Sequence, residues 1–288
     1  MHQYYRQLAY YSALIVVLLT PLHSTTVQAN AIERLFAPKA EHWAFWEAQD
    51  PESTQQIDHS AWNDFLARYI QPGEDGINRV RYSRVSDNDR QQLGSYIGSL
   101  EKLPVRQFNS QQQLAYWVNL YNALTVYVVL QHYPVNGIRD IDISPGFFAN
   151  GPWGKKLLTI EGQNVSLNDI EHRILRPIWQ DPRLHYVLNC ASLGCPNLPN
   201  EAIHADIIEA VLEQSAAAYV NHPRGVKFKN GRLYVSSIYS WFRNDFGASD
   251  TAVINHLKHY ASPELSDRLF AVERISGYDY NWSLNDAP

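Results

Sequence analysis

The segment from Ser110 to Tyr133 limits the possible folds more than any other part of the chain. Its residues follow helical spacing, Pro134 comes directly after it, and apolar positions lie almost all round the helix between Leu114 and Leu130. A soluble helix that is apolar on every side has to be surrounded by other elements. We therefore predict that this helix forms the centre of the fold.

Two amides interrupt the apolar surface of this helix. Asn119 and Asn122 lie three residues apart and therefore on one side of it. Buried amides need hydrogen-bond partners, so they either connect the core to neighbouring backbone or face a cleft in which they bind a substrate. The first role is the commoner one, but the sequence leaves both open.

The rest of the chain mixes helical and strand patterns. Capping residues and apolar spacing predict helices that begin near Ser60, Ser86, Ser166, Glu201 and Ser249. Short runs bounded by turns predict strands over 80–85, 138–143, 155–160, 184–188 and 270–275, and a hairpin over 226–235 around Asn230-Gly231. The order shows no regular βαβ repeat and no glycine-rich phosphate loop. We predict an α+β fold: one mixed domain over residues 57–288, with a long buried central helix and a small, largely antiparallel sheet.

The N-terminal residues have the pattern of a targeting segment. Arg6 precedes an apolar run from Leu8 to Leu19, and small residues lead up to Ala29. Such a run is too short for an ordinary membrane span. We expect residues 1–29 to be a signal peptide cleaved after Ala29, with an uncleaved anchor as the alternative. Residues 30–56 would form an N-terminal arm, and the mature protein would be periplasmic or secreted, without a stable membrane span.

The overall composition is that of an ordinary globular protein. Apolar residues make up 45% of the chain, and 24 basic against 29 acidic residues give a formal net charge of -5. This balance provides no basic footprint of the kind that binds nucleic acid. We expect no nucleic acid partner and no cofactor, whereas a peptide or small-molecule substrate stays possible.

The segment from Asp181 to Pro196 contains both cysteines of the chain, Cys190 and Cys195. Its apolar residues 184–188 predict a short buried strand that leads into a turn of small residues. A fully extended chain would separate the two cysteine Cα atoms by roughly 16 Å, whereas a disulfide needs about 5.5 Å. A disulfide, which two cysteines in an exported chain favour, therefore requires a tight turn here.

The same turn is suited to a nucleophilic thiolate. A cysteine nucleophile needs a base, a group that orients the base, and donors for an oxyanion, and backbone N–H groups of the turn are candidate donors. His185 and His172 are the candidate bases, and Glu171, Asp245 or Asn189 would orient one of them. The candidate catalytic residues are Cys190, Cys195, His185, His172, Glu171 and Asp245, and the candidate substrate-binding residues are Asn119, Asn122, Asn189, Ser192 and Arg183.

Two further interpretations are weaker. Metal binding by the two cysteines with His185 and His172 is disfavoured because the spacing matches no zinc ribbon, so no metal site is predicted. A Ser192 nucleophile would lack the Gly-x-Ser-x-Gly frame that commonly presents a catalytic serine.

Glu171 is the most informative charged residue of the sequence. In the helix predicted after Ser166 it falls inside the apolar face, with His172 at the edge of that face. A carboxylate on an apolar face costs free energy unless it has a partner. An ion pair with an arginine such as Arg176 or Arg183, or a contact with a histidine, would supply one.

Several separated motifs resemble the family called domain of unknown function 547. They are Trp117–Thr125, Ser166–Arg176, the residues Arg183, His185, Asn189, Cys190, Ser192, Cys195 and Pro196, then Ser240–Gly247 and the terminal Tyr278–Asn285. The resemblance covers most of the chain after the predicted arm. It implies a fold neighbourhood and candidate positions but no reaction, because the family has no settled activity.

These features favour an exported thiol-dependent hydrolase or acyltransferase that acts on peptide or amide substrates of the cell envelope. The substrate class follows from the expected compartment alone. The alternative is a non-catalytic binding or scaffold module in which a Cys190–Cys195 disulfide is purely structural.

Overall fold

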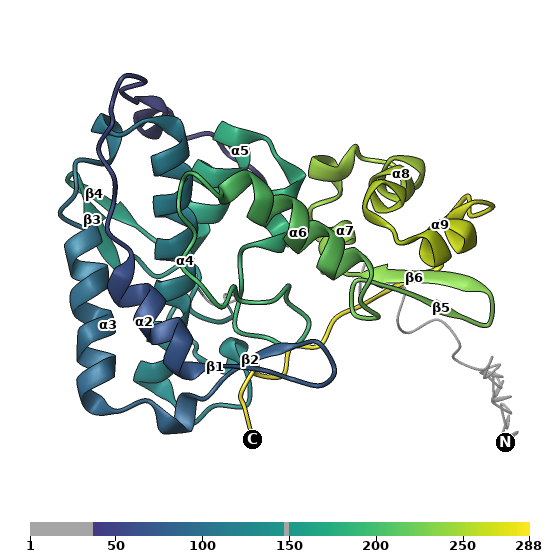
Figure 1. The fold of residues 1–288 in the computed structure, drawn as a ribbon, viewed down its shortest axis with the longest axis horizontal. Coiled ribbons are helices and arrows are strands. Elements are labelled where there is room, and N and C mark those ends of the chain that lie inside the picture. Colours follow the sequence, from purple (N-terminus) through teal and green to yellow (C-terminus); the bar gives the residue numbers. More distant parts are fainter. Residues whose placement is uncertain (1–36, 147–149) are drawn as a thin grey trace, which may run out of the picture.

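The computed structural model describes residues 37–146 and 150–288. The predicted signal peptide and the first residues of the predicted arm lie outside the described residues. Figure 1 shows helices gathered around the long helix α4, with pairs of short strands at the periphery and helices α8 and α9 at one end. The fold is α+β, as the mixture of sequence patterns predicted.

Helix α4 (Ser110–His132) confirms the predicted central helix. The Asn109 side chain caps it by accepting a hydrogen bond from the Gln112 N–H, and every residue from Gln113 to Val126 is buried. Trp117 on α4 meets Trp46 of the N-terminal arm edge to face, with ring centroids 4.9 Å apart. The helix is apolar on all sides because other elements cover it on all sides.

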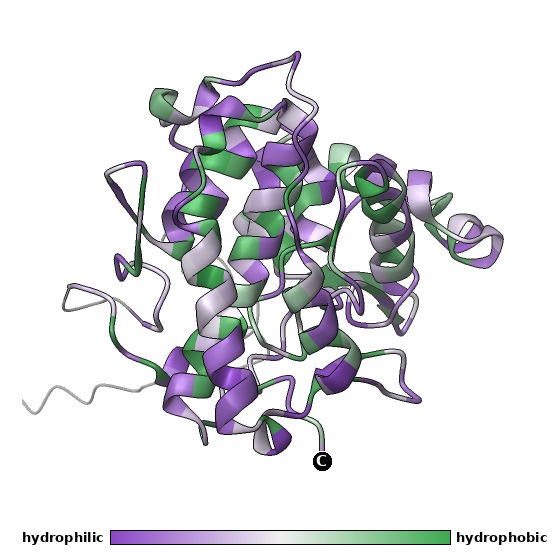
Figure 2. Ribbon diagram, turned by 60° about the vertical axis from the view of Figure 1, so that its left-hand side comes forward, coloured by the Kyte–Doolittle hydropathy of each residue, from purple (hydrophilic) through white to green (hydrophobic). Residues whose placement is uncertain are grey.

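Besides α4, the described chain contains further helices. They are α2 (Ser60–Tyr69), α3 (Asp87–Leu100), α5 (Arg176–Trp179), α6 (Ile208–Val220), α7 (Ile238–Trp241), α8 (Asp250–Tyr260) and α9 (Pro263–Leu269). The predicted caps of α3 and α8 are confirmed, because Ser86 and Ser249 each accept a hydrogen bond from the N–H three residues later. Figure 2 shows both hydrophobic and hydrophilic residues along these helices, as expected for elements with one face against the core.

In the described residues the strands form three small sheets rather than the one sheet that was predicted. β1 (Ile70–Pro72) pairs with β2 (Asn78–Val80), and β3 (Leu158–Ile160) pairs with β4 (Gln163–Val165), both antiparallel. The third sheet contains β5 (Val226–Lys229), β6 (Arg232–Ser236) and β7 (Gly277–Asp279). The β5–β6 hairpin is the predicted one, and its turn residues Asn230 and Gly231 have φ values of 50° and 72°. β7 joins β6 in parallel, which no local pattern indicated.

The strand predicted over residues 184–188 is wrong. Residues Pro182–Tyr186 form a short 3-10 helix, η6. Proline occupies its first turn, and the Asp181 carboxylate accepts a hydrogen bond from the Arg183 N–H, which is a helix start. A short apolar run that is buried on all sides has no period, so sequence alone does not separate a strand from a helical turn.

Three other strand predictions also need correction. Residues 138–143 contain the 3-10 helix η4 (Ile138–Asp140). The run over 80–85 ends as a strand at Val80 and continues as the 3-10 helix η2 (Tyr82–Arg84). No strand of the described chain covers 270–275, because the last strand, β7, begins only at Gly277. These runs are too short for alternation to outweigh the tertiary contacts.

The helix predicted after Ser166 is present and has an unusual geometry. Ser166 caps it, since its hydroxyl accepts a hydrogen bond from the Asp169 N–H at 3.2 Å. The following residues Asp169–Leu175 form π-helical turns, η5, before α5 begins. Wide turns of this kind are frequent at functional sites. Both neighbours in this turn, Glu171 and His172, are buried, with exposed fractions of 9% and 6%.

The two amides of α4 hold backbone rather than face open space. Asn119 accepts a hydrogen bond from the Ile203 N–H and donates one to the Ile203 carbonyl. Asn122 accepts from the Asn189 N–H and donates to the Val187 carbonyl, both at 2.8 Å. Both amides therefore connect the core to backbone, which was the commoner of the two predicted roles. Asn122 attaches α4 to the segment that carries the cysteines, and Asn119 attaches it to the loop after that segment.

Removing the Asn122 amide should destabilise the whole chain. Asn122→Ala leaves the Asn189 N–H and the Val187 carbonyl buried without partners, which should lower the free energy of unfolding by about 2–4 kcal/mol. Urea denaturation followed by tryptophan fluorescence measures the change. Asn88→Ala on the exposed face of α3 is the control and should change the free energy by less than about 0.5 kcal/mol. Equal stability of the two variants would contradict this role of Asn122.

Candidate functional site

The cysteine segment forms the tight turn that a disulfide requires. Cys190 and Cys195 are bridged, with Cα atoms 6.2 Å apart. The Asn189 side chain closes the turn from inside, because its oxygen accepts from the Ala191 N–H and its nitrogen donates to the Pro196 carbonyl. Ala191 has a φ of 57°, so the chain reverses through a left-handed residue at this point.

The C-terminal segment lies across this turn and holds it in place. The Leu193 and Gly194 N–H groups donate to the carbonyls of Ser283 and Asn281, each at 2.8 Å. Only glycine fits at position 194, because the Cβ atom of any other residue would lie 2.8 Å from the Asn281 nitrogen. This close pairing carries the C-terminal segment, including Tyr280, over the sulfur atoms.

Tyr280 contacts both sulfur atoms. Its hydroxyl lies 3.1 Å from the Cys190 Sγ and 3.1 Å from the Cys195 Sγ, and the Ser192 hydroxyl lies 3.1 Å from the phenol and 3.3 Å from the Cys190 Sγ. The Cys190 N–H also points at the Cys195 Sγ, at 2.9 Å. Cys190 is half-buried, whereas Cys195 is only 2% exposed. The sulfur pair therefore has one accessible and one enclosed member, both beside hydroxyl donors.

Burial determines the protonation of Tyr280. Loss of water around the phenol raises its pKa far above the usual value near 10. The hydroxyl therefore keeps its proton and can donate it to a sulfur atom. Because a phenol has one proton, it can donate to only one of the two sulfurs at a time.

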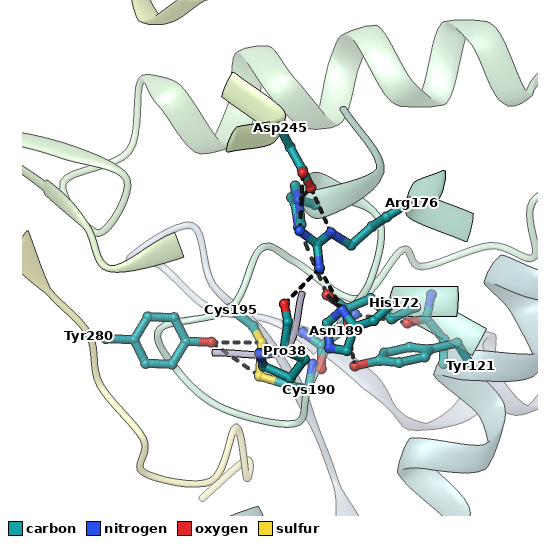
Figure 3. Close-up of polar contacts among 12 residues, drawn as sticks. Pro38, Tyr121, His172, Arg176, Asn189, Cys190, Cys195, Asp245 and Tyr280 are labelled. Carbon is teal, nitrogen blue, oxygen red and sulfur yellow. Dashed lines mark hydrogen bonds and ion pairs between the residues drawn. A yellow bond between two sulfur atoms is a disulfide. The ribbon is translucent and has the colours of Figure 1, made fainter. Parts of the chain in front are cut away.

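A second group of polar side chains surrounds Asp245 (Figure 3). Arg176 donates to both carboxylate oxygens of Asp245, at 2.6 and 3.0 Å, and the His185 Nε2 lies 2.7 Å from Asp245 Oδ2. Phe242 covers this group: its ring stacks on His185 at 4.5 Å and lies under the Arg176 guanidinium at 4.5 Å. Burial alone would raise the pKa of Asp245, but the hydrogen bonds from His185 and Arg176 outweigh it and hold that pKa well below its usual range.

His172 joins this group as a neutral ring. Its Nδ1 lies 3.0 Å from the Arg176 Nη1, and since an arginine can only donate, the histidine accepts this hydrogen bond. Burial and the positive charge of Arg176 lower the pKa of His172 to about 4. The negative charge of Glu171 raises this pKa, but it offsets the lowering only in part. The His172 Nδ1 lies 3.8 Å from the Glu171 carboxylate, but the two groups form no ion pair near neutral pH because the histidine is neutral there.

Glu171 takes a tyrosine as its partner. The Tyr121 hydroxyl of α4 donates to Glu171 Oε2 at 2.8 Å, and the other carboxylate oxygen lies 3.9 Å from the His185 Nδ1. The predicted burial and the predicted neighbouring histidine are confirmed. The alternative of an arginine partner is wrong, because Arg176 binds Asp245 and Arg183 binds other acids.

Arg183 is separate from these groups. Its guanidinium binds Asp181 beside it and Glu209 and Glu213 on α6. These three carboxylates occupy its donors on the outside of η6, so Arg183 supports the attachment of η6 to α6.

The candidate catalytic residues thus fall into two clusters. The sulfur cluster contains Cys190, Cys195, Ser192 and Tyr280, and the Asp245 cluster contains Glu171, His172, Arg176, His185 and Asp245 with the Tyr121 hydroxyl (Figure 3). Within the described part of the chain no hydrogen bond joins a sulfur atom to an imidazole nitrogen. That the cysteines share one pocket with a histidine stays a prediction.

Sequence reasoning missed three members of these clusters as site residues. Tyr280, Tyr121 and Arg176 each lie inside a motif that resembles the family, but none was predicted as a site residue, and Arg176 was named only as a candidate ion-pair partner of Glu171. Each acts through a side-chain contact between elements far apart in the chain. Their presence in those motifs was the one signal that could have identified them.

Residues 105–220 match the family model described as protein of unknown function, DUF547. The match contains three of the predicted motifs, including both cysteines, and it confirms the predicted family resemblance over these residues. Asp245 and Tyr280 lie beyond the matched range. A search of curated proteins and a search of solved structures each found no match.

Two negative findings concern the described residues only. None of their helices is long and apolar enough to cross a membrane. Their histidine, cysteine, aspartate and glutamate side chains include no group of three or more arranged to hold a metal ion.

Replacing the carboxylate of Glu171 should destabilise the protein. Glu171→Gln turns the charge-assisted hydrogen bond from Tyr121 into a weaker neutral one and leaves a buried amide without a matched partner, so the free energy of unfolding should fall by about 1–3 kcal/mol. Thermal and urea denaturation measure the loss. The exposed Glu273→Gln is the control. If both variants melt like the unchanged protein, Glu171 is solvated and its contact with Tyr121 is unimportant.

Stability should also fall as the pH decreases from about 6.5 toward 4. In the unfolded chain His172 binds a proton near pH 6.5, whereas in the folded chain its pKa is about 4, so the unfolded state binds more protons between these values and gains on the folded state. His172→Asn retains an acceptor for Arg176 but cannot titrate. Urea denaturation at several pH values should show a shallower decrease for this variant, and an unchanged slope would argue against a neutral, buried His172.

Proposed function

We propose that the protein is a thiol-dependent hydrolase or acyltransferase that acts on peptide or amide bonds of cell-envelope material, with the Cys190–Cys195 pair as its reactive group. The observation that carries the proposal is the phenol of Tyr280, 3.1 Å from both sulfur atoms. A proton donor fixed beside a sulfur stabilises the thiolate over the thiol. The envelope as the site of action rests on the expected export.

Reduction of the disulfide is the first step. A dithiol reductant supplies two electrons and two protons, becomes a disulfide itself, and leaves Cys190 and Cys195 as thiols. Cys190 is the better nucleophile because it is half-buried, whereas Cys195 is enclosed at 2% exposure. Loss of the Cys190 proton gives a thiolate that accepts hydrogen bonds from Tyr280 and Ser192.

The thiolate then exchanges one acyl partner for another. Its sulfur forms a bond to the carbonyl carbon, the carbon–nitrogen bond breaks, and the leaving amine takes up a proton equivalent to the one that the thiol lost. Water or a second nucleophile adds to the thioester, the carbon–sulfur bond breaks, and the thiolate is restored. With water the result is hydrolysis, and with another amine or alcohol it is acyl transfer.

In this proposal the Asp245 cluster has a supporting role and does not react. The paired charges of Arg176 and Asp245 fix the 3-10 helix η7 (Arg243–Phe246) to α5, and the ring of His185 is fixed between Asp245 and Phe242. Glu171 accepts a hydrogen bond from Tyr121, and its negative charge raises the pKa of both Tyr121 and Tyr280. We propose that these residues keep the surroundings of the sulfur cluster rigid and contribute to the electrostatic potential there.

A purely structural disulfide is the second candidate, and one observation favours it. The turn is fixed by the Asn189 side chain and by backbone hydrogen bonds from Leu193 and Gly194, so it is rigid with the bridge closed. In that case the protein is a binding or scaffold module, and the bridge stabilises the turn without reacting.

Thiol reactivity separates the two candidates. After mild reduction with dithiothreitol, iodoacetamide labelling across pH should show Cys190 reacting with a midpoint well below the pKa of about 8.5 of a free thiol. Tyr280→Phe removes the donor and should move that midpoint upward, whereas the control Tyr234→Phe on β6, whose ring contacts Lys229, should not. Cleavage of a peptide library should require the reductant and be lost in Cys190→Ser. A bridge that resists reduction, or thiols that react only near pH 8.5, would leave the scaffold as the function.

A further inference from the structure

A groove runs along one face of α6, and neither cysteine is among the residues that line it. Its helical wall repeats every three or four residues, through Ile207, Ala210, Val211, Gln214, Ala218 and Tyr219, and its other wall is the loop from 197 to 203. The twelve residue steps between the first and last of these positions give a length of about 18 Å at the helical rise of 1.5 Å. The volume of the groove is about 470 Å³, within the range of small-molecule sites.

Arg224 lies at the Tyr219 end of this groove. Its guanidinium is 5.5 Å above the Tyr219 ring, and its Nη2 donates to the Asn197 side chain at 2.6 Å. Its Nε is buried without a hydrogen-bond partner, and in residues 37–146 and 150–288 no carboxylate lies within ion-pair distance of it. A buried charged group is usually paired with an opposite charge.

The acids near Arg224 are not available to it. Asp75, whose charge acts on Arg224, is bound by both terminal nitrogens of Arg79, at 2.7 and 2.6 Å. Glu201 belongs to the groove wall but is exposed and forms no ion pair with Arg224 in the described chain. Burial lowers the pKa of Arg224, which is the electrostatic result of a cation with too little compensating charge.

The groove selects the kind of anion. It presents one guanidinium, the neutral amides of Asn78, Asn200 and Gln214, and small alanine side chains. A planar carboxylate with a single charge matches one guanidinium, whereas sites for phosphate groups commonly combine several positive groups. A length of about 18 Å corresponds to about five residues of extended peptide, and amide side chains are suited to hydrogen bonds with a peptide backbone.

We propose that this groove binds a short extended peptide whose free C-terminal carboxylate pairs with the Arg224 guanidinium. Such a peptide would supply the anion that Arg224 lacks. It would also lie against the outside of the cysteine turn, because Asn197 follows Cys195 by two residues and the Tyr219 hydroxyl donates to the Gly194 carbonyl. The proposal does not depend on thiol chemistry, since it applies to the protein with its disulfide closed.

Binding of a peptide acid and of its amide tests the proposal. Isothermal titration calorimetry on the oxidised full chain compares tetra-alanine with tetra-alanine amide, which differ only in the terminal carboxylate. The acid should bind at least tenfold more tightly than the amide. Arg224→Gln should remove this preference, and Arg232→Gln, which neutralises an exposed arginine on β6, should retain it. Circular dichroism confirms that each variant is folded.

Three results would overturn the proposal. Equal affinity for acid and amide would mean that the carboxylate is not recognised, and no saturable binding of either peptide would mean that the groove is not a peptide site. Competition by inorganic phosphate at the same concentration as the peptide acid would show a general anion site instead. The comparison of acid with amide uses the unchanged protein, so it stays decisive even if Arg224→Gln does not fold.

Discussion

The hydrogen bonds between Asn122 and the backbone of the cysteine segment determine the geometry of the site. They join the buried central helix, α4, to the peptide groups of Val187 and Asn189. An amide with two donors and an oxygen acceptor satisfies a carbonyl and an N–H at once, and in the core neither group has water as an alternative. The direction in which the chain leaves η6, and hence the position of Cys190, follows from this contact.

The Asp245 cluster has the corresponding role between distant parts of the chain. Arg176 binds Asp245 on η7 with two nitrogens and the Pro38 carbonyl of the N-terminal arm with a third. A bidentate guanidinium–carboxylate pair fixes orientation as well as distance. It connects the core around α4 with the second core, which contains Phe246 and the residues of α8. Removing one member of such a buried pair leaves its partner's charge without compensation, which is strongly destabilising. The cluster therefore fixes the two cores relative to each other, independently of any chemistry at the sulfur atoms.

The C-terminal segment completes the site because it pairs with the cysteine turn. Its backbone bonds to Leu193 and Gly194 bring Tyr280 over both sulfur atoms. The same turn contacts the α6 groove on its other side through Gly194 and Asn197. One short loop therefore connects the sulfur cluster, the central helix and the groove that holds Arg224, so a ligand in the groove would lie only a few residues from the disulfide.

The sequence by itself determined the features that depend on neighbours in the chain. The central helix, the caps at Ser86 and Ser249, the Asn230-Gly231 hairpin and the burial of Glu171 were all predictable, because helical spacing, capping and turn chemistry act over a few residues. The family motifs also indicated the segments that carry the site. The tertiary structure alone decided that residues 184–188 form a 3-10 helix, that β7 pairs in parallel with β6, and that Tyr280 and Arg176 belong to the site. Each of these depends on contacts between residues far apart in the chain, and the local pattern is the same whether or not such contacts form.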